Sequence, residues 1–146
     1  MDMKKLQEEL AFDEGVVNKI YLDHLGYPTF GIGHLIRETD PEHGLPVNTP
    51  VSEQRVTEAF QQDCLTVESD CVRMFANFFE LPEEVQRVVA NMMFNLGFTR
   101  LNKFNNFKAA IRDNDWKKAA VEGRDSLWYR QVTKRAERLM KRLENV

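Results

Sequence analysis

The sequence predicts an α+β protein of one domain, in which a long helix joins a small β-hairpin lobe to a larger helical lobe. β-branched and aromatic residues, punctuated by glycine and proline, fill residues 16–35. Apolar residues then recur at steps of three or four, and the nearly continuous apolar run VVANMMFNL follows them. The expected boundaries are 15–52 for the small lobe, 53–79 for the connecting helix, and 80–146 with 1–14 for the helical lobe.

The amino-terminal segment predicts a helix that ends at Glu14. Met3, Leu6 and Leu10 share one helical face, and Gly15 stands where a helix commonly ends. Residues 16–35 are then expected to form a small antiparallel hairpin.

A loop and a long helix are expected next. Residues 36–52 contain three prolines and a glycine, which predicts a loop, with a short strand as the alternative. Ser52 is a plausible N-cap of an amphipathic helix. Its apolar positions are Val56, Phe60, Cys64, Val67, Cys71, Met74 and Phe78. Leu81-Pro82 is expected to restart the chain, and the run VVANMMFNL predicts a central buried helix closed by Gly97. Residues 101–146 predict three or four shorter helices.

Composition excludes several classes of protein. The 20 Lys and Arg residues against 23 Asp and Glu residues argue against nucleic-acid binding. No apolar run is long enough to span a bilayer, and the opening MDMKKLQEEL lacks the apolar block of a secretory signal, so synthesis in the cytoplasm is expected.

Cys64 and Cys71 lie seven residues apart, too far for a disulfide on one helix, and are expected to be buried thiols.

Two acids and a hydroxyl stand out in the first third of the chain. Glu14 sits at a helix carboxyl end, where the macrodipole disfavours a negative charge. Asp23 lies in the hairpin, and two carboxyls facing each other across a cleft are the equipment of glycoside hydrolysis. Thr29 could hold a water. Taken singly, each has a simpler interpretation: a surface Glu, an Asp that starts the turn before Gly26, and an ordinary strand Thr.

Three segments, in the same order, resemble one known family. FDEGVVNKIYLDHLGYPTFGIGHLI, NMMFNLG and GRDSLWYRQVTKRAERL are similar to the catalytic signature, the buried core helix and the late W-Y-x-Q-x-x-x-R-A-x-R segment of the T-even phage lysozymes, glycoside hydrolase family 24. The resemblance covers most of the chain and implies a phage-type lysozyme fold.

The resemblance also implies catalytic roles. Glu14 matches the general acid, Asp23 the second catalytic carboxylate and Thr29 a residue that helps to place the attacking water. The family inverts anomeric configuration, so its acids leave room for a water, roughly 6.5–9.5 Å apart. Whether Asp23 acts as a base or stabilises charge is open. Neither a metal nor an organic cofactor is implied.

Two arginines match residues that support the acids. By the resemblance, Arg135 pairs with Glu14, and Arg138 pairs with Asp13. These cations would anchor the hairpin side of the cleft to the helical lobe.

Four further positions match the family. His34 matches a histidine that pairs with an aspartate of the long helix, here Asp63, in a stabilising role. Leu35 and Phe94 match residues that line the sugar-binding cleft, although Phe94 also suits a core position.

Some features depart from the family pattern or bear on the cleft. Gly31 and Gly33 are expected to clear space for a glycan backbone. The stretch between residues 35 and 63 is shorter than is usual in the family. At two expected cleft positions, Phe107 and Glu122, the residue type differs from the family pattern. The net charge of −3 also contrasts with that of the basic relatives.

The function implied is that of a muramidase, a glycoside hydrolase that cleaves the β-1,4 bond between N-acetylmuramic acid and N-acetylglucosamine in peptidoglycan. The expected biological role is that of a monomeric endolysin, which accumulates in the host cytoplasm and reaches the wall through a holin lesion. A tail-associated lysozyme is an alternative role. A non-catalytic glycan-binding or lysis-regulating protein and a lytic transglycosylase are rival functions.

Overall fold

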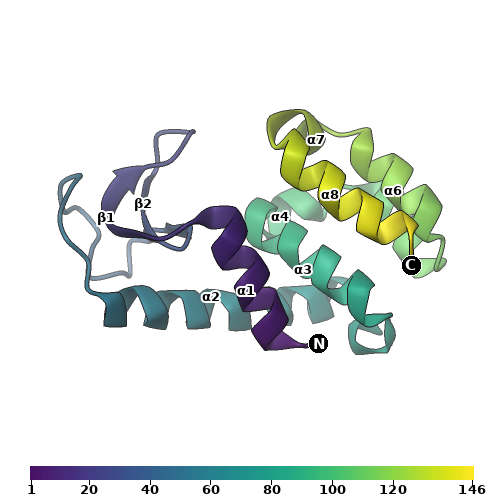
Figure 1. Cartoon of the computed structure of the whole chain (residues 1–146), viewed down its shortest axis with the longest axis horizontal. Coiled ribbons are helices and arrows are strands. Elements are labelled where there is room, and N and C mark those ends of the chain that lie inside the picture. Colours follow the sequence, from purple (N-terminus) through teal and green to yellow (C-terminus); the bar gives the residue numbers. More distant parts are fainter. The chain divides into compact units, whose positions relative to one another are not determined.

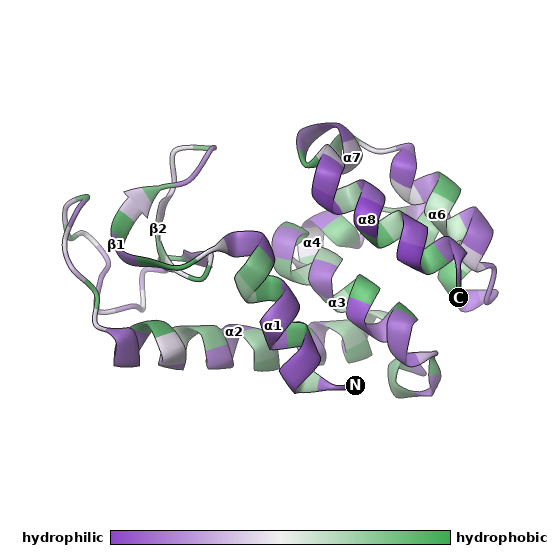
Figure 2. Cartoon of the chain, in the orientation of Figure 1, coloured by the Kyte–Doolittle hydropathy of each residue, from purple (hydrophilic) through white to green (hydrophobic).

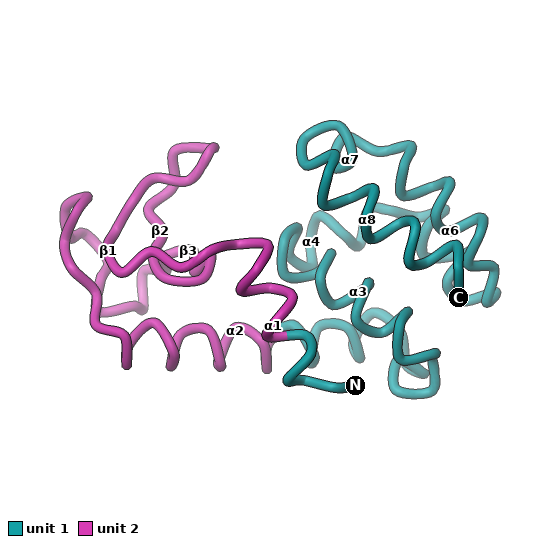
Figure 3. The backbone as a smooth tube through the Cα atoms, in the orientation of Figure 1, with its two compact units in different colours: residues 1–6, 67–146 teal, residues 7–66 magenta.

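The computed structural model describes residues 1–146 and divides into two compact units (Figure 3). One unit consists of residues 7–66, and the other of residues 1–6 and 67–146. The division falls within two helices, α1 (Met3–Glu14) and α2 (Glu53–Met74). Helices and one three-stranded antiparallel sheet make up the chain, which confirms the predicted α+β class (Figure 1).

Helix α1 ends where the sequence predicts. The side chain of Asp2 caps its amino end, with Oδ1 accepting a hydrogen bond from the Lys5 N–H at 3.1 Å. At the other end, Gly15 adopts a φ of +70°, and its N–H donates to the Ala11 carbonyl at 3.0 Å. A left-handed glycine of this kind stops a helix, so Glu14 is the last helical residue.

The predicted hairpin is present and gains a short third strand. Strands β1 (Val17–Leu22), β2 (Pro28–Gly31) and β3 (His34–Leu35) form an antiparallel sheet in that order. Tyr21 lies opposite Thr29, and Thr29 lies opposite Leu35. Because directly opposed residues point to the same face, these three side chains form one row across the sheet.

The other face of the sheet is the core of this unit. Ile20 and Phe30, which alternate with Tyr21 and Thr29, are fully buried. They pack with three residues that precede or belong to α2, namely Val51, Val56 and Ala59. One face of the sheet is thus committed to packing, which leaves the row on the opposite face for function.

The loop at residues 36–52 contains no strand, only a single bridge between Lys19 and Pro50. At its end, Ser52 Oγ accepts a hydrogen bond from the Arg55 N–H at 3.1 Å, which confirms the predicted N-cap of α2.

Short helices build the second unit. They are η1 (Phe78–Glu80), α3 (Glu83–Leu96), α4 (Phe98–Leu101), α5 (Asn105–Arg112), α6 (Trp116–Arg124), α7 (Leu127–Gln131) and α8 (Thr133–Glu144). α3 is buried along most of its length and stops at Gly97, whose φ is +79°, as predicted. α6 packs against α5 and α8, and α8 packs against α3. Figure 2 shows α8 as largely hydrophilic. The hydrophobic positions that interrupt its polar residues are those of the buried, packed face.

The connecting helix is shorter than the predicted 53–79. α2 ends at Met74, where the Arg112 side chain donates to the Met74 carbonyl at 3.2 Å, and Phe78 lies in η1 instead. Cys64 and Cys71 are buried free thiols, as predicted. None of the helices combines the length and the apolar composition needed to cross a bilayer.

Candidate active site

Glu14 lies against the backbone of the turn between β2 and β3. A Cβ atom added at Gly33 would stand 2.9 Å from Glu14 Oε1 and 3.0 Å from Cδ. Gly33 also adopts a φ of +62°. A glycine is therefore required here on two grounds, and the space that it clears is occupied by the carboxyl of Glu14.

Asp23 initiates the turn between β1 and β2. Its Oδ1 accepts hydrogen bonds from the N–H groups of Leu25 and Tyr27, each at 2.9 Å, and its own N–H donates to the Tyr27 carbonyl at 2.9 Å. Gly26, with a φ of +85°, completes the turn. The simple interpretation of Asp23 as a turn former is thus correct, but it uses Oδ1 and leaves Oδ2 for other partners.

Thr29 occupies the middle of the row that crosses the sheet. It is only 4% exposed, between Tyr21 on β1 and Leu35 on β3. Its hydroxyl donates to the Tyr27 carbonyl at 3.0 Å. Because that bond uses the only hydroxyl proton, Oγ1 can serve a water only as an acceptor.

Tyr21 shows that the two acids lie near one group. Burial raises the pKa of the Tyr21 phenol, and the negative charges of Glu14 and then Asp23 raise it further. Glu14 comes from the end of α1 and Asp23 from the turn after β1, so the fold brings both carboxyls within electrostatic reach of the same side chain. Sequence reasoning did not identify Tyr21, although its place two residues before Asp23 puts both on one strand face.

His34 has two carboxylate partners. Nδ1 lies 2.7 Å from Asp63 Oδ2, and Nε2 lies 2.8 Å from Asp40 Oδ2. Burial of the ring lowers the His34 pKa, but the hydrogen bonds and charges of Asp63 and Asp40 outweigh it, so the pKa is raised overall. Asp40 was not identified from the sequence because nothing in a loop pattern indicates which distant ring it will meet.

Leu35, one of the two predicted sugar-contacting residues, ends the row on β3 and is 51% exposed. Phe94, the other, lies half-buried on α3 in the second unit.

The two supporting arginines lie on α8. Arg135 Nε donates to Asn91 Oδ1 at 2.9 Å. Asp13 and Glu14 belong to the unit of residues 7–66, whereas Arg135 and Arg138 belong to the other unit. Their expected pairings remain predictions.

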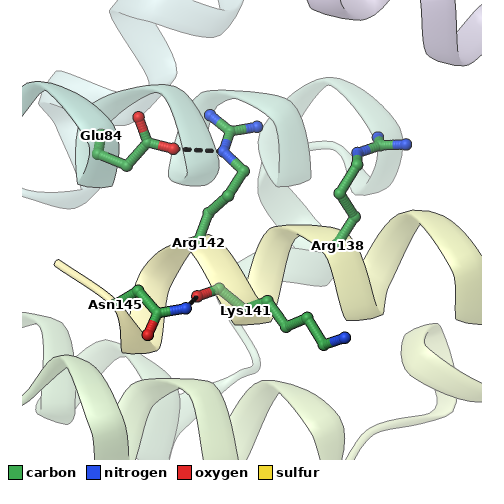
Figure 4. A pocket seen from close by; sticks show the side chains of 5 residues that line it. All are labelled: Glu84, Arg138, Lys141, Arg142 and Asn145. Carbon is green, nitrogen blue, oxygen red and sulfur yellow. Dashed lines mark hydrogen bonds and ion pairs between the residues drawn. The ribbon is translucent and has the colours of Figure 1, made fainter.

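A cavity of about 410 Å³ lies beside the carboxyl half of α8 (Figure 4). Its lining residues are Glu84, Arg138, Lys141, Arg142 and Asn145. Arg142 pairs with Glu84, and the side chain of Arg138 extends from α8 to the same side, whereas that of Lys141 points elsewhere. The cavity contains none of the three predicted catalytic residues. The chain gathers no group of three or more His, Cys, Asp or Glu side chains able to hold a metal ion.

Known proteins are similar to this chain over nearly its whole length. The family model described as phage lysozyme matches residues 11–145. The chain is 33% identical to the pre-baseplate central spike protein Gp5 of Enterobacteria phage T4, over 92% of this chain and 26% of that protein. It is 25% identical to the probable T4-type lysozyme 2 of Dictyostelium discoideum, over 94% of this chain and 92% of that protein. It is 28% identical to the peptidoglycan hydrolase gp36 of Pseudomonas phage phiKMV, over 97% of this chain and 15% of that protein. The chain thus spans about a quarter of the spike protein but nearly all of the Dictyostelium protein.

Proposed function

The chain belongs to the phage lysozyme family, and from that premise we propose that it is a muramidase that hydrolyses the β-1,4 bond between N-acetylmuramic acid and N-acetylglucosamine in peptidoglycan. One observation carries the proposal. The sheet face opposite the core bears Thr29 and Leu35. Tyr21 lies on the same face, and its pKa is raised by burial and by the negative charges of both Glu14 and Asp23. A helix end and a hairpin turn thus supply an acid pair beside a hydroxyl.

Glu14 is the proposed general acid. Protonation of the glycosidic oxygen lets the leaving sugar depart as an alcohol while positive charge develops at the anomeric carbon. The backbone of Gly33 beside the carboxyl limits the positions that Glu14 can adopt, so the acid is presented from a defined direction.

Asp23 and Thr29 are the proposed water-binding groups. Thr29 Oγ1 accepts one proton of the water, since its own proton is donated to the Tyr27 carbonyl. Asp23 Oδ2, which the turn leaves available, accepts the other proton or stabilises the charge on the sugar. Attack by a water held opposite the leaving group inverts the anomeric configuration. Leu35 then offers an exposed apolar contact to a neighbouring sugar ring.

The test is clearing of outer-membrane-stripped Gram-negative cells. Wild type should reduce the turbidity, and Glu14→Gln should lose about 10²–10⁴-fold in rate, the usual contribution of a general acid. Glu8→Gln, which changes an exposed acid of the same helix, is the matched control and should clear like wild type. Wild type that fails to clear, or a Glu14→Gln variant that clears equally well, supports a non-catalytic glycan-binding or lysis-regulating protein instead.

The products separate the proposed reaction from its chemical rival. A hydrolase releases reducing ends, and NMR of fresh products should show the α-anomer if a water attacks with inversion. A lytic transglycosylase forms 1,6-anhydro-muramyl products, which mass spectrometry detects as a loss of one water.

Two biological roles remain within the proposal. An endolysin would accumulate in the host cytoplasm and act on the wall after holin action. The 33% identity to a central spike protein favours the tail-associated role as a second candidate. Mass spectrometry of purified phage particles distinguishes them, because a tail lysozyme is a structural component and an endolysin is absent from the particle.

A further inference from the structure

Strand β3 has little backbone pairing of its own. It consists of His34 and Leu35, and it lies at the edge of the sheet with β2 as its one neighbour. Strands in globular proteins usually run to about 3–10 residues, so a strand this short depends on other attachments. Gly33, whose backbone lies against the Glu14 carboxyl, immediately precedes it. Whatever holds β3 therefore also determines the position of the backbone beside the proposed acid.

The side chain of His34 supplies the attachment. Its ring is buried and packs against Phe30 of β2, with 4.8 Å between the ring centroids. Asp63 of α2 binds one ring nitrogen, and Asp40 of the loop after β3 binds the other. A ring bound at both nitrogens cannot turn without breaking a hydrogen bond. The ring therefore fixes β3 both to the helix and to the loop.

Asp40 is the centre of the loop side of this attachment. Its Oδ2 faces His34 Nε2 and also accepts from the Arg37 N–H at 2.8 Å, and its Oδ1 accepts from Arg55 Nη2 at 3.2 Å. Arg55 in turn donates to both oxygens of Glu42, at 2.9 and 3.0 Å. Burial raises the Asp40 pKa, but the Arg37 N–H and then the His34 ring outweigh it, so the carboxyl is ionised at neutral pH.

The charge balance of this cluster depends on the proton of the ring. The charged side chains around the ring come from α2 and from the loop, namely Asp63, Arg55, Asp40, Arg37 and Glu42. β2 contributes the uncharged Phe30. Three carboxylates are thus matched by three cations only while His34 is protonated. A neutral imidazole has a single N–H, so one of its two carboxylate partners then faces a lone pair. Asp63 is held in a helix, whereas Asp40 is in a loop, so Asp40 is the partner that separates.

We propose that Asp40 is a positioning residue of the muramidase site: by holding Nε2 of His34, it keeps β3 in place, and with it the Gly33 backbone beside the Glu14 carboxyl. While the ring is charged, the acid is presented from one direction. When the ring loses its proton to solvent, Asp40 separates, β3 loosens and the Glu14 carboxyl takes up other positions. The inference rests on the proposed function and extends it to a residue that acts through β3.

Asp40→Asn tests this role because it keeps the size of the side chain and removes its charge. We expect the NMR titration midpoint of His34 to move to lower pH, with that of the exposed His24 unmoved. The alkaline limb of kcat/KM should move down with the His34 midpoint. Between the midpoints of variant and wild type, kcat should fall at least about tenfold relative to wild type, with little change in KM, as expected for a misplaced acid.

Glu42→Gln is the matched control for the loop. It removes a second buried carboxylate of the same loop, one that binds Arg55 but makes no hydrogen bond to the His34 ring. Its alkaline limb should therefore stay with that of wild type. A limb that moves equally in both variants would show a general loss of loop stability and would overturn the specific role of Asp40.

A measurement on the wild type keeps this inference separate from the proposed function. The Ile36 amide donates to β2 at 3.0 Å, next to β3, and the Asn48 amide donates to β1 at 2.7 Å on the opposite edge of the sheet. As the pH rises through the His34 midpoint, the hydrogen-exchange protection of Ile36 should fall at least about tenfold relative to that of Asn48, the value of one hydrogen bond to a charged group. This result is expected whether or not the protein cleaves peptidoglycan.

Two results would overturn the inference even where clearing by wild type supports the muramidase. One is a ratio of Ile36 to Asn48 protection that stays constant through the His34 midpoint. The other is an Asp40→Asn variant that folds as wild type and keeps the wild-type alkaline limb.

Discussion

Nδ1 of His34 lies 2.7 Å from Oδ2 of Asp63, so the first residue of β3 is tied directly to α2. The other ring nitrogen binds Asp40 at 2.8 Å, and Arg37 Nη2 donates to Asp63 Oδ1 at 3.3 Å. An imidazole that faces two carboxylates must carry both protons to satisfy both. The charged ring therefore connects the sheet, the following loop and the long helix.

Loss of the His34 ring should destabilise the protein in a pH-dependent manner. Because the folded-state pKa is raised above 6.5, the stabilisation is complete below the unfolded pKa and is lost as pH rises through the folded one. We expect His34→Asn to cost about 3 kcal/mol in urea unfolding at pH 5.5, and less at pH 9–10. His24→Asn, at an exposed position, should cost little at either pH. A cost independent of pH would contradict the charged-ring assignment.

Gly33→Ala should impair activity more than its loss of stability explains. The added Cβ meets the Glu14 carboxyl at 2.9 Å and must displace it, and the left-handed φ adds a strain of roughly 1–2 kcal/mol. Gly44→Ala is a matched control, with a φ of +83° and open space around the new Cβ. Urea unfolding should show similar losses for the two variants, whereas clearing rates should fall at least about tenfold only for Gly33→Ala.

Gly123→Ala should overpack the second unit. Its Cβ would lie 2.3 Å from the sulfur of Met140, where α6 packs against α8. We expect a loss of about 1–3 kcal/mol. Shortening the partner provides the check: the double variant Gly123→Ala, Met140→Ala should be more stable than the sum of the two single losses predicts. Strict additivity would mean that the two residues do not compete for space.

Arg124 should stabilise the protein at neutral pH and lose that effect in acid. It bonds Glu137 at 2.9 Å and Glu144 at 2.7 Å, and the Tyr129 hydroxyl also donates to Glu137. The hydrogen bond from Arg124 and then that from Tyr129 lower the Glu137 pKa to about 2. A depressed pKa gives stability that is present above about 4.5 and is lost as pH falls toward about 2. The Tm difference between wild type and Arg124→Gln should therefore narrow between pH 5 and pH 2. Arg130→Gln, at an exposed position on α7, should show no such trend.

The two thiols should be unreactive in the folded protein. Burial, with the nearby charge of Asp63, raises the Cys64 pKa to about 12, and burial also raises that of Cys71. Thiolate is the reactive form, so native protein at pH 8 should react with a disulfide reagent only through unfolding. Both thiols should react at once in urea. A rapid stoichiometric reaction of the native protein would show that one of them is accessible.

Local signals were sufficient for most elements of the fold. The end of α1 follows from Gly15, the start of α2 from Ser52 and the end of α3 from Gly97, because caps and left-handed glycines act within a few residues. The end of α2 was misjudged. Phe78 continues the apolar period of the helix, but the chain leaves the helix at Met74, where a side chain from the distant α5 binds the final carbonyl.

The residues of the candidate site likewise fall into those that the sequence could identify and those that only the tertiary structure brings in. Glu14, Asp23 and Thr29 could be selected from residue types and family resemblance, whereas Tyr21, Asp40 and the contact of Gly33 with Glu14 could not. The glycine was expected to clear space for a glycan, and in the structure that space is filled by the carboxyl of the proposed acid.

Apart from the end of α2, residue order decided which segments become helix, strand and turn, since those choices depend on backbone preferences and on the spacing of apolar side chains along a few turns. Strand register and the direction of α1 decided which polar groups meet, because partners such as His34 and Asp63 lie far apart in the chain. A one-residue slip of β1 against β2 would turn Tyr21 and Asp23 into the core face and leave every local pattern unchanged. The packing of Ile20 and Phe30 with Val51, Val56 and Ala59 opposes that slip, and so fixes which side chains of β1 lie on the outer face of the sheet.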